Sequence, residues 1–301
     1  MTLVFNLLIG LGVAFLGFVV QTANGGIIRK VIGRLQRRRG PIWYQEFLDI
    51  FKACSRRAIT HGWIFDFGVI MAVGGIAATA MFMPIAHIVA FPGYDNFFIF
   101  VYLLAVGMLG MAMSASGSGN PNASIGVMRA LTSMMAYEVP FLVIVLTIIK
   151  ITGTSSLSEL AAYQQSNQWF ALYLPIGFIV SFISLMAMLG KKPFETFIAP
   201  AEIASGPMVE YGGKQLGLLF IMHELTIFIE VSLFVNLFLG GGPTVFLFFV
   251  KYFMVYLVAS LISNVLGRWK VDDVVIFFYK WPLFFAVIQA LLVIFGVGIY
   301  G

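Results

Sequence analysis

Long apolar segments recur along almost the whole chain and restrict it to a membrane fold. A helix that crosses a bilayer needs about 20 mostly apolar residues. Segments that reach or approach this length occupy residues 3–20, 67–91, 97–113, 139–151, 169–189, 216–239, 245–266 and 274–300. The fourth is short unless the stretch 128–140 belongs to the same helix. None alternates apolar and polar residues as the strands of a membrane β-barrel do. We therefore expect an all-α, polytopic integral membrane protein with about eight transmembrane helices in a single membrane domain, 1–301.

The composition agrees with this fold class and limits the chemistry of the chain. Of the 301 residues, 60% are hydrophobic and 10% are charged, whereas soluble domains are about half apolar and about a quarter charged. Cys54 is the single cysteine and the three histidines are scattered, so no metal-ligand spacing is present. We expect this chain to bind no metal or cofactor and to hold no catalytic residue.

The basic residues are distributed unevenly among the predicted loops. Nine of the eighteen lysines and arginines lie between Arg29 and Arg57, in the first loop. The third, fifth and seventh loops hold six more, whereas the even-numbered loops hold none apart from Lys150 at the border of the fourth. Basic loops stay in the cytoplasm. We expect the odd loops to be cytoplasmic, both termini to lie outside a cell membrane, and the net charge of +5 to reflect topology rather than binding of nucleic acid.

The first loop is too patterned for a plain connector. Gly40-Pro41 interrupts the chain, and the apolar residues that follow predict a short amphipathic helix; they are Trp43, Phe47, Leu48, Ile50, Phe51 and Ala53. Such a helix can lie in the membrane interface with its basic flanks toward the cytoplasm. Two interpretations stay open: a topogenic loop with no other role, or a docking surface for a cytoplasmic partner. The docking surface would comprise the loops at about 24–64, 190–215 and 267–273.

The fifth loop is acidic and broken. Glu195, Glu202 and Glu210 lie within sixteen residues, and Pro193, Pro200, Pro207 and Gly206 prevent one long helix. Irregular backbone at membrane depth is tolerated only where protein buries it or it lines a wet cavity. These acids are therefore candidates for a proton path, with ordinary exposed loop acids as the alternative.

Further acids fall inside the apolar segments. Glu224 and Glu230, with His223 beside the first, lie in the sixth segment, and Glu138 precedes Pro140 at the mouth of the fourth. A charge at the bilayer centre costs at least about 2.5 kcal/mol, so such an acid usually serves a proton or ion path. Glu224 and Glu230 are separated by about 600° of helical rotation and should point to different faces. The alternative is structural pairing with Lys150, Lys251 or Lys280.

Four motifs in a fixed order resemble a known family. They are GRLQRRRGP at 33–41, MRALTSMMAYEVP at 128–140, PFETFIAPAEIASGPMVEY at 193–211 and FIMHE at 220–224, and RWKVDD follows at 268–273. On eight predicted spans they resemble the heel-forming membrane subunit of respiratory complex I. Its homologues occur in membrane-bound nickel–iron hydrogenases, formate hydrogenlyases and archaeal membrane-bound sulfane sulfur reductases.

The resemblance implies a non-catalytic anchor and coupling subunit of a redox-driven ion pump. Partners would be hydrogenase-like large and small subunits, an iron–sulfur subunit and antiporter-like membrane subunits, together with lipid. Iron–sulfur clusters and any nickel–iron centre would lie on those partners. By the resemblance, Glu138, Glu195, Glu202, Glu210 and Glu224 match acids of a buried polar channel, and Glu230 and His223 extend the candidate proton path. The candidate residues for docking the peripheral arm are Arg34, Arg37, Arg38, Arg39, Arg56 and Arg57.

The departures from the pattern favour one branch of this family. Complex I members usually have acids at the positions of Ile198 and Pro200, and their first loop typically continues differently from Ile42-Trp43. We therefore expect the hydrogenase or sulfur-reductase branch, with the quinone-chamber subunit of NADH:quinone oxidoreductase as the alternative. A stand-alone transporter is the second alternative, although the chain shows no convincing repeat of two halves. Neither the terminal electron acceptor nor the coupling ion, H⁺ or Na⁺, follows from the sequence.

Overall fold

The fold is a bundle of long helices. The structure, a computed structural model, describes residues 2–57 and 61–296, and within them every regular element is a helix. Seven helical spans of this part are long and apolar enough to cross a membrane: α1 (Thr2–Leu35), α3 (Trp63–Met81), α4 (Phe97–Gly117), α5 (Pro121–Thr152), α10 (Gly213–Phe238), α11 (Val245–Val265), and α12 (Val271–Lys280) together with α13 (Pro282–Ile294). The predicted all-α, polytopic membrane fold is confirmed.

Two predicted spans contain a break at proline. The segment 169–189 forms a short helix α7 (Phe170–Tyr173) and then α8 (Pro175–Met188), which is apolar but shorter than a full span. Pro175 has no amide hydrogen to continue α7, and the residue before a proline is pushed away from helical geometry. Pro282 separates α12 from α13 in the same way. The end of the last predicted span, 297–300, lies outside the described residues.

Two helices are longer than the sequence predicted. α5 includes 128–140, so Arg129, which we expected in a loop, lies in its third turn. α1 continues to Leu35, which places Arg29 and Arg34 on the helix and starts the first loop at residue 36 rather than near 24. Positive side chains near a helix C-terminus interact favourably with the helix dipole, so this basic stretch can extend the apolar helix that precedes it.

Short helices organise the long loops. The predicted amphipathic helix is α2 (Gln45–Cys54). The regular elements of the fifth loop are α9 (Pro200–Ile203) and the 3₁₀ turn η1 (Gly206–Met208). Ala204, Ser205 and Gly206, where the chain passes from one to the other, have left-handed φ values of 50, 76 and 53°. The broken fifth loop is therefore confirmed. α6 (Leu157–Ser166) follows α5 at the other end of the molecule.

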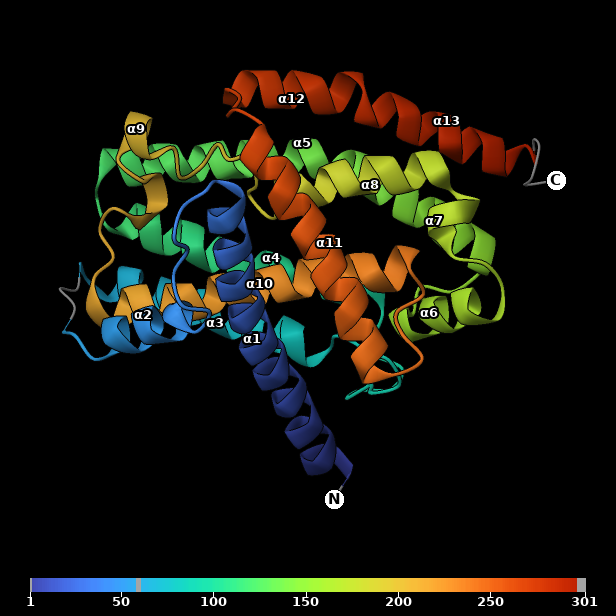
Figure 1. The fold of residues 1–301 in the computed structure, drawn as a ribbon, viewed down its shortest axis with the longest axis horizontal. Helices are drawn as coiled ribbons and strands as arrows, with labels where there is room; N and C mark the ends of the chain where they lie inside the picture. The colour runs from blue at the N-terminus through green and yellow to red at the C-terminus, as the bar shows by residue number, and fades with distance from the viewer. Residues whose placement is uncertain (1, 58–60, 297–301) are drawn as a thin grey trace.

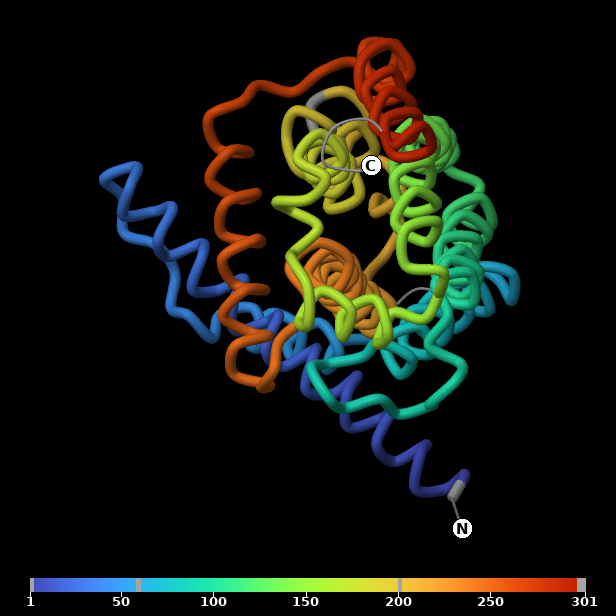
Figure 2. The backbone as a smooth tube through the Cα atoms, turned by 90° about the vertical axis from the view of Figure 1, so that its right-hand side faces the viewer, coloured from blue at the N-terminus to red at the C-terminus, as the bar shows by residue number. Residues whose placement is uncertain are grey.

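α10 occupies the centre of the bundle. Figure 1 shows α5, α8, α10 and α12–α13 running along the length of the molecule, while α1 and α11 cross them obliquely. Figure 2 views the first group nearly end-on and shows the other helices arranged around α10. Most of α10 is buried, including all residues from Glu224 to Phe238. A central helix can hold polar side chains because it presents little surface to lipid.

Small residues bring α3 and α4 into close contact. A methyl group on Gly75 would lie 2.7 Å from the Gly107 nitrogen, and one on Gly68 would lie 2.5 Å from the Ser114 nitrogen. The Ser114 hydroxyl donates to the Phe65 carbonyl oxygen at 2.8 Å. Within lipid, helices associate through such close contacts and interhelical hydrogen bonds rather than through the hydrophobic effect. This hairpin forms one wall of the bundle.

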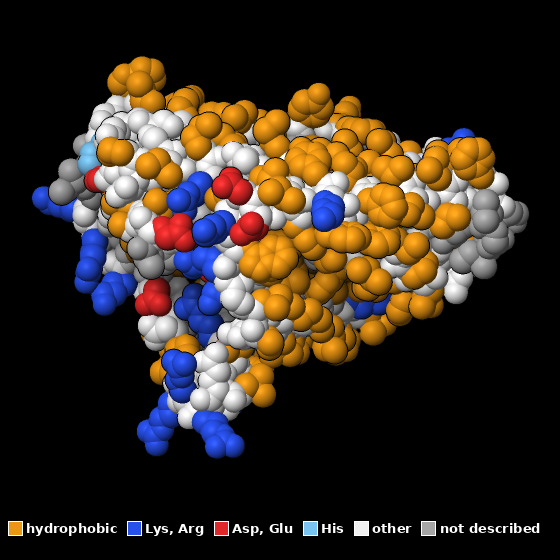
Figure 3. All heavy atoms as spheres, turned by 90° about the horizontal axis from the view of Figure 1, so that it is seen from above, with side chains coloured by type: hydrophobic (Ala, Val, Ile, Leu, Met, Phe, Trp, Pro, Cys, Tyr) orange, Lys and Arg blue, Asp and Glu red, His pale blue; other side chains and the backbone are white. Residues whose placement is uncertain are grey.

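Charge gathers at one end of the molecule. Figure 3 shows most of the visible Lys and Arg side chains toward the end at which Figure 1 places α2 and α9, and apolar side chains over most of the rest of this face. We call the end formed by residues 34–57 and 190–215 the basic end. The expected segregation of basic loops is visible in the structure, while the side of the membrane that they face stays a prediction.

At the opposite end, Asp95 joins the loop before α4 to the start of α6. Its carboxylate accepts hydrogen bonds from the Ser156 hydroxyl at 2.8 Å and from the Ser158 amide at 3.0 Å. Burial alone would raise the pKa of Asp95, but these hydrogen bonds outweigh it and hold the pKa below its ordinary value. Asp95 is thus a charged cap for the N-terminus of α6.

We expect Asp95→Asn to destabilise this end by about 1–2 kcal/mol at neutral pH, because it removes charge-assisted hydrogen bonds. Since the folded-state pKa is lowered, the stabilisation is complete above the unfolded-state pKa and is lost as the pH falls through the folded-state pKa. Melting temperatures of wild type and variant in detergent, measured from pH 7 downward, should therefore converge in acid. A difference that grew as the pH fell would contradict this role for Asp95.

Candidate functional site

Three helices meet at a hydrogen-bonded chain of buried polar groups. The Tyr252 hydroxyl on α11 donates to Gln21 Oε1 on α1 at 2.5 Å, and Gln21 Nε2 donates to Glu224 Oε2 on α10 at 3.2 Å. Tyr252 and Gln21 are fully buried, and 8% of Glu224 is exposed. Because Gln21 donates to Glu224 and accepts from Tyr252, its amide orientation is fixed by both partners. The Glu224 carboxylate is thereby held inside the bundle.

A second acid, which we did not predict, lies beside this chain toward the basic end. Glu46 of α2 is buried and accepts from Arg29 Nε of α1 at 2.8 Å. Glu224 lies within electrostatic reach of Glu46, Arg29 and Lys191. Lys191 in turn contacts Tyr256, with its Nζ 3.4 Å from the hydroxyl and 4.8 Å from the ring centroid. The buried acid of α10 is therefore surrounded by polar groups from four other segments.

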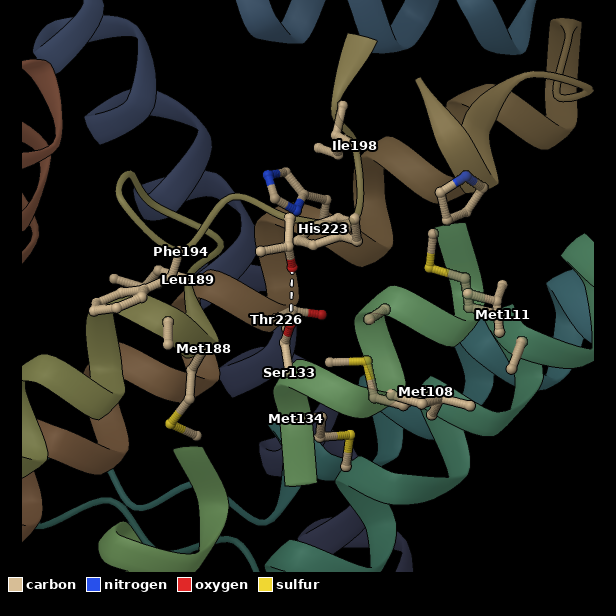
Figure 4. A pocket seen from close by; sticks show the side chains of 18 of the residues that line it. Met108, Met111, Ser133, Met134, Met188, Leu189, Phe194, Ile198, His223 and Thr226 are labelled. Atoms are coloured by element: carbon tan, nitrogen blue, oxygen red, sulfur yellow. Dashed lines mark hydrogen bonds between the residues drawn. The ribbon is translucent and has the colours of Figure 1, made fainter. Parts of the chain in front are cut away.

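Glu230 lies on a different face of α10 from Glu224 and lines a cavity of about 280 Å³. The cavity is bounded by α4, α5, α10, the end of α8 and the start of the fifth loop, and its polar residues are Ser133, Tyr137, Thr196, His223, Thr226 and Glu230. Figure 4 shows His223, Thr226 and Ser133 between Met108, Met111 and Met134 on one side and Met188 and Leu189 on the other. The predicted divergence of Glu224 and Glu230 is thus confirmed.

Glu138 lies next to this cavity without lining it. It is half-buried on α5, directly after Tyr137, which lines the cavity and lies within electrostatic reach of both Glu138 and Glu230. Ser133, one turn earlier, shares a hydrogen bond of 2.8 Å with Thr196 of the fifth loop. α5 therefore connects the fifth loop to the acids of the bundle.

The three acids of the fifth loop do not gather in one buried channel. Glu195 pairs with Arg268 at 2.8 Å, Glu202 pairs with Arg129 at 2.7 Å, and Glu210 lies 3.3 Å from His61. Asn120 Nδ2 also donates to Glu210 at 2.5 Å. The side chain of Glu202 is 56% exposed, so Glu202 does not lie in the buried polar channel that the resemblance implied. These pairs fasten the loop to α5, to the residues before α3 and to the α11–α12 connection.

The alternative in which lysines neutralise the buried acids is not what the structure shows. Lys251 Nζ donates to the carbonyl oxygens of Leu239 and Gly241 at 2.6 and 2.9 Å and lies over the Trp169 ring. Lys280 lies over Trp281, and Lys150 is exposed. Within the described residues, Glu224 and Glu230 have no ion pair with a lysine.

The six candidate docking arginines share one environment. Arg34, Arg37, Arg38, Arg39, Arg56 and Arg57 are all exposed at the basic end, and no ion pair to them is found within residues 2–57 and 61–296. Ile198, at a position where complex I members usually have an acid, lines the cavity instead. α9 begins at Pro200, the second such position. The cavity wall at residue 198 is therefore apolar.

Comparisons with known proteins agree with this architecture. The family model described as NADH dehydrogenase matches residues 7–294. The chain belongs to the NADH dehydrogenase family. A subunit of the NADH-quinone oxidoreductase of Geobacillus sp. is 33% identical over 257 residues, which cover 80% of this chain and 77% of that protein. A subunit of the F(420)H(2) dehydrogenase of Methanosarcina mazei is 27% identical over 253 residues, 78% of this chain and 71% of that protein.

A solved structure is similar to this member of the NADH dehydrogenase family over nearly its whole length. One chain of the membrane-bound sulfane sulfur reductase, described as an archaeal respiratory membrane complex, has a TM-score of 0.91 and 38% sequence identity. The similarity covers 95% of this chain and 99% of that one. The family resemblance inferred from the four motifs is confirmed.

Proposed function

We propose that this chain is the membrane anchor and coupling subunit of a redox-driven ion pump of the hydrogenase or sulfane sulfur reductase type. The observation that carries the proposal is the placement of Glu224 and Glu230 on the most buried helix, away from lipid and without a lysine partner among the described residues. Burying two such acids in a membrane helix destabilises it, and acids in this position usually mark a path for protons or ions. Similarity to a chain of a sulfur reductase complex supports the branch.

In this proposal the two sides of α10 have different tasks. Glu224, held by Gln21, exchanges protons with the basic end, and Glu230, in the cavity beside Tyr137 and near Glu138, passes charge onward to antiporter-like subunits. His223, Glu195, Glu202 and Glu210 stay candidates for the surface end of this path. A carboxylate can bind a proton, and the resulting carboxyl group can release it, when burial brings the pKa of the group near the ambient pH.

The exposed arginines of the basic end would bind the peripheral arm of iron–sulfur and hydrogenase-like subunits, which carries the clusters and any nickel–iron centre. The basic end would then face the cytoplasm, with both termini outside. This chain contributes no cofactor ligand in the proposal, and among its described residues no group of three His, Cys, Asp or Glu is placed to hold a metal ion.

One observation favours a second candidate, the quinone-chamber subunit of NADH:quinone oxidoreductase. The cavity of about 280 Å³ is largely apolar with a few converging polar groups, as binding sites for amphiphilic small molecules usually are. Ile198 in its wall counts against this candidate because the acid usual in complex I members is absent.

Purification of the tagged chain from its native membranes in a mild detergent tests the proposal. We expect iron–sulfur, hydrogenase-like and antiporter-like subunits to accompany it, and electron transfer in the purified complex not to require added quinone. Quinone-dependent turnover would favour the second candidate. A chain that migrates alone and transports a solute in vesicles would overturn both.

A further inference from the structure

Glu46 is an acid in an unusual place for an amphipathic helix. The buried residues of α2 are Glu46, Ile50 and Ala53, whereas Leu48 and Phe51 are exposed. Glu46 thus lies on the face that packs into the molecule, with 6% of its surface exposed. Its Oε1 accepts from Arg29, but its Oε2 is buried with no hydrogen-bond partner in the part of the chain that the structure describes. Burying a carboxylate with one oxygen lacking a hydrogen-bond partner destabilises the fold, so its presence here calls for a functional explanation.

The backbone of α1 is shaped to receive this carboxylate. A methyl group on Gly25 would collide with the Glu46 carboxylate, and one on Gly26 would collide with the Trp43 carbonyl oxygen. Two adjacent glycines therefore allow the first loop and α2 to lie directly on α1. At Gly25 any larger residue would displace the carboxylate of Glu46.

The position of Gly25 places Glu46 in line with the buried polar chain. Gln21, Gly25 and Arg29 are spaced four residues apart on α1, so they lie on one face with a rise of about 6 Å per step. Gln21 donates to Glu224, the Glu46 carboxylate rests at Gly25, and Arg29 reaches the surface with 55% of its side chain exposed. Outward along α1, the order is Glu224, Glu46, Arg29.

The groups that face Glu46 come from each neighbouring segment. They are Arg29 of α1, Asp49 of α2, Lys191 after α8 and, within electrostatic reach, Glu224 of α10. Burial raises the pKa of Glu46, and the positive charges of Arg29 and Lys191 only partly oppose this. Both its neutral and its charged form are therefore supported by particular neighbours.

We propose that Glu46 is the proton relay between the basic end and Glu224, and that it links the docking loop to the buried acid. In the loaded state the proton is on the free Oε2 of Glu46. It then moves to the carboxylate of Glu224, leaving Glu46 charged and paired with Arg29. Because Glu46 is on α2, within the loop that would meet the peripheral arm, a shift of that loop on α1 changes the proton path directly. This inference rests on the proposed function and adds a residue to it.

The test uses the intact complex in sealed vesicles, with electron transfer and ion gradient measured together. Glu46→Gln keeps the shape and removes the proton-carrying group, so we expect ions moved per electron to fall by at least about tenfold while electron transfer stays within about twofold. Asp273→Asn is the control, since it removes an exposed acid in the first turn of α12 that is not among the groups facing Glu46. Its coupling should equal that of the wild type.

Infrared difference spectra of the oxidised and reduced complex provide a second readout. A carboxyl C=O band that disappears in Glu46→Gln, shifts in Glu46→Asp and persists in Asp273→Asn is the expected result. If the Gln variant does not assemble, the Asp variant alone decides: an unshifted band overturns the relay. Wild-type coupling in Glu46→Gln with lost coupling in Glu224→Gln would refute the role of Glu46 only. Wild-type coupling in both variants would refute the proposed function as well.

Discussion

Glu224→Gln is expected to leave the complex assembled and electron transfer running but to reduce ion pumping by at least about tenfold. The amide retains an oxygen that can accept from Gln21 Nε2, so the hydrogen-bonded chain from Tyr252 through Gln21 can persist. What it loses is the ability to bind and release a proton.

The measurement is the ratio of gradient to electron flux in vesicles, compared with the variant Asp273→Asn. Asp273 is an exposed acid in the first turn of α12, and its loss should cost only a few tenths of a kcal/mol of helix stability. Glu138→Gln should give an intermediate loss, since Glu138 is only half-buried and lies beside the cavity. A normal ratio in Glu224→Gln would leave the chain as an anchor whose buried acids have no part in coupling.

The helices could be predicted from the sequence because each is a local feature. Continuous apolar runs, a proline at a break and six-residue spacing of two glutamates depend only on neighbouring positions. The direction of Glu224 and Glu230 to different sides of α10 followed from helical geometry alone. The limits of α1 and α5 could not be predicted in this way. Their polar ends, around Arg29 and Arg129, are helical because of contacts made in the folded protein, and hydropathy gives no signal for them.

The composition of the site could not be predicted, because its members meet only in the fold. Gln21 and Tyr252 are 231 positions apart in sequence, and neither belongs to a recognisable motif. Glu46 carried one usable signal: it lies four residues before Ile50 and seven before Ala53, on what proved to be the buried face of α2. The ion pairs of the fifth loop were equally hidden, since Arg129 and Arg268 lie far from their acids along the chain.

Reversing two charges of the first loop, Arg37→Glu with Arg38→Glu, is expected to detach the peripheral arm. Both side chains are exposed at the basic end and unpaired among the described residues, so their charge is free for a partner. Replacing attraction by repulsion at two sites costs about 3 kcal/mol, or roughly a hundredfold in the dissociation constant. Facing charges are screened over about 8–10 Å at ordinary ionic strength, so added salt should weaken the wild-type attachment and narrow the difference between the two proteins.

The backbone of this loop determines how the variants are chosen. Arg37 lies two residues after the end of α1, in the left-handed region with φ 57°, and the Arg38 amide donates back to the Gly33 carbonyl oxygen at 2.7 Å. Neither feature requires the guanidinium groups, so Arg37→Gln with Arg38→Gln keeps the turn and should give an intermediate loss of the arm. Lys150→Glu reverses a single charge at the exposed C-terminal end of α5, away from the basic end, and is the control for charge reversal elsewhere on the surface. Retention of iron–sulfur subunits in detergent at graded salt is the readout. An arm held equally by the Glu double variant and by Lys150→Glu would show that the basic loop is topogenic only, because a docking surface loses affinity when its charge is inverted.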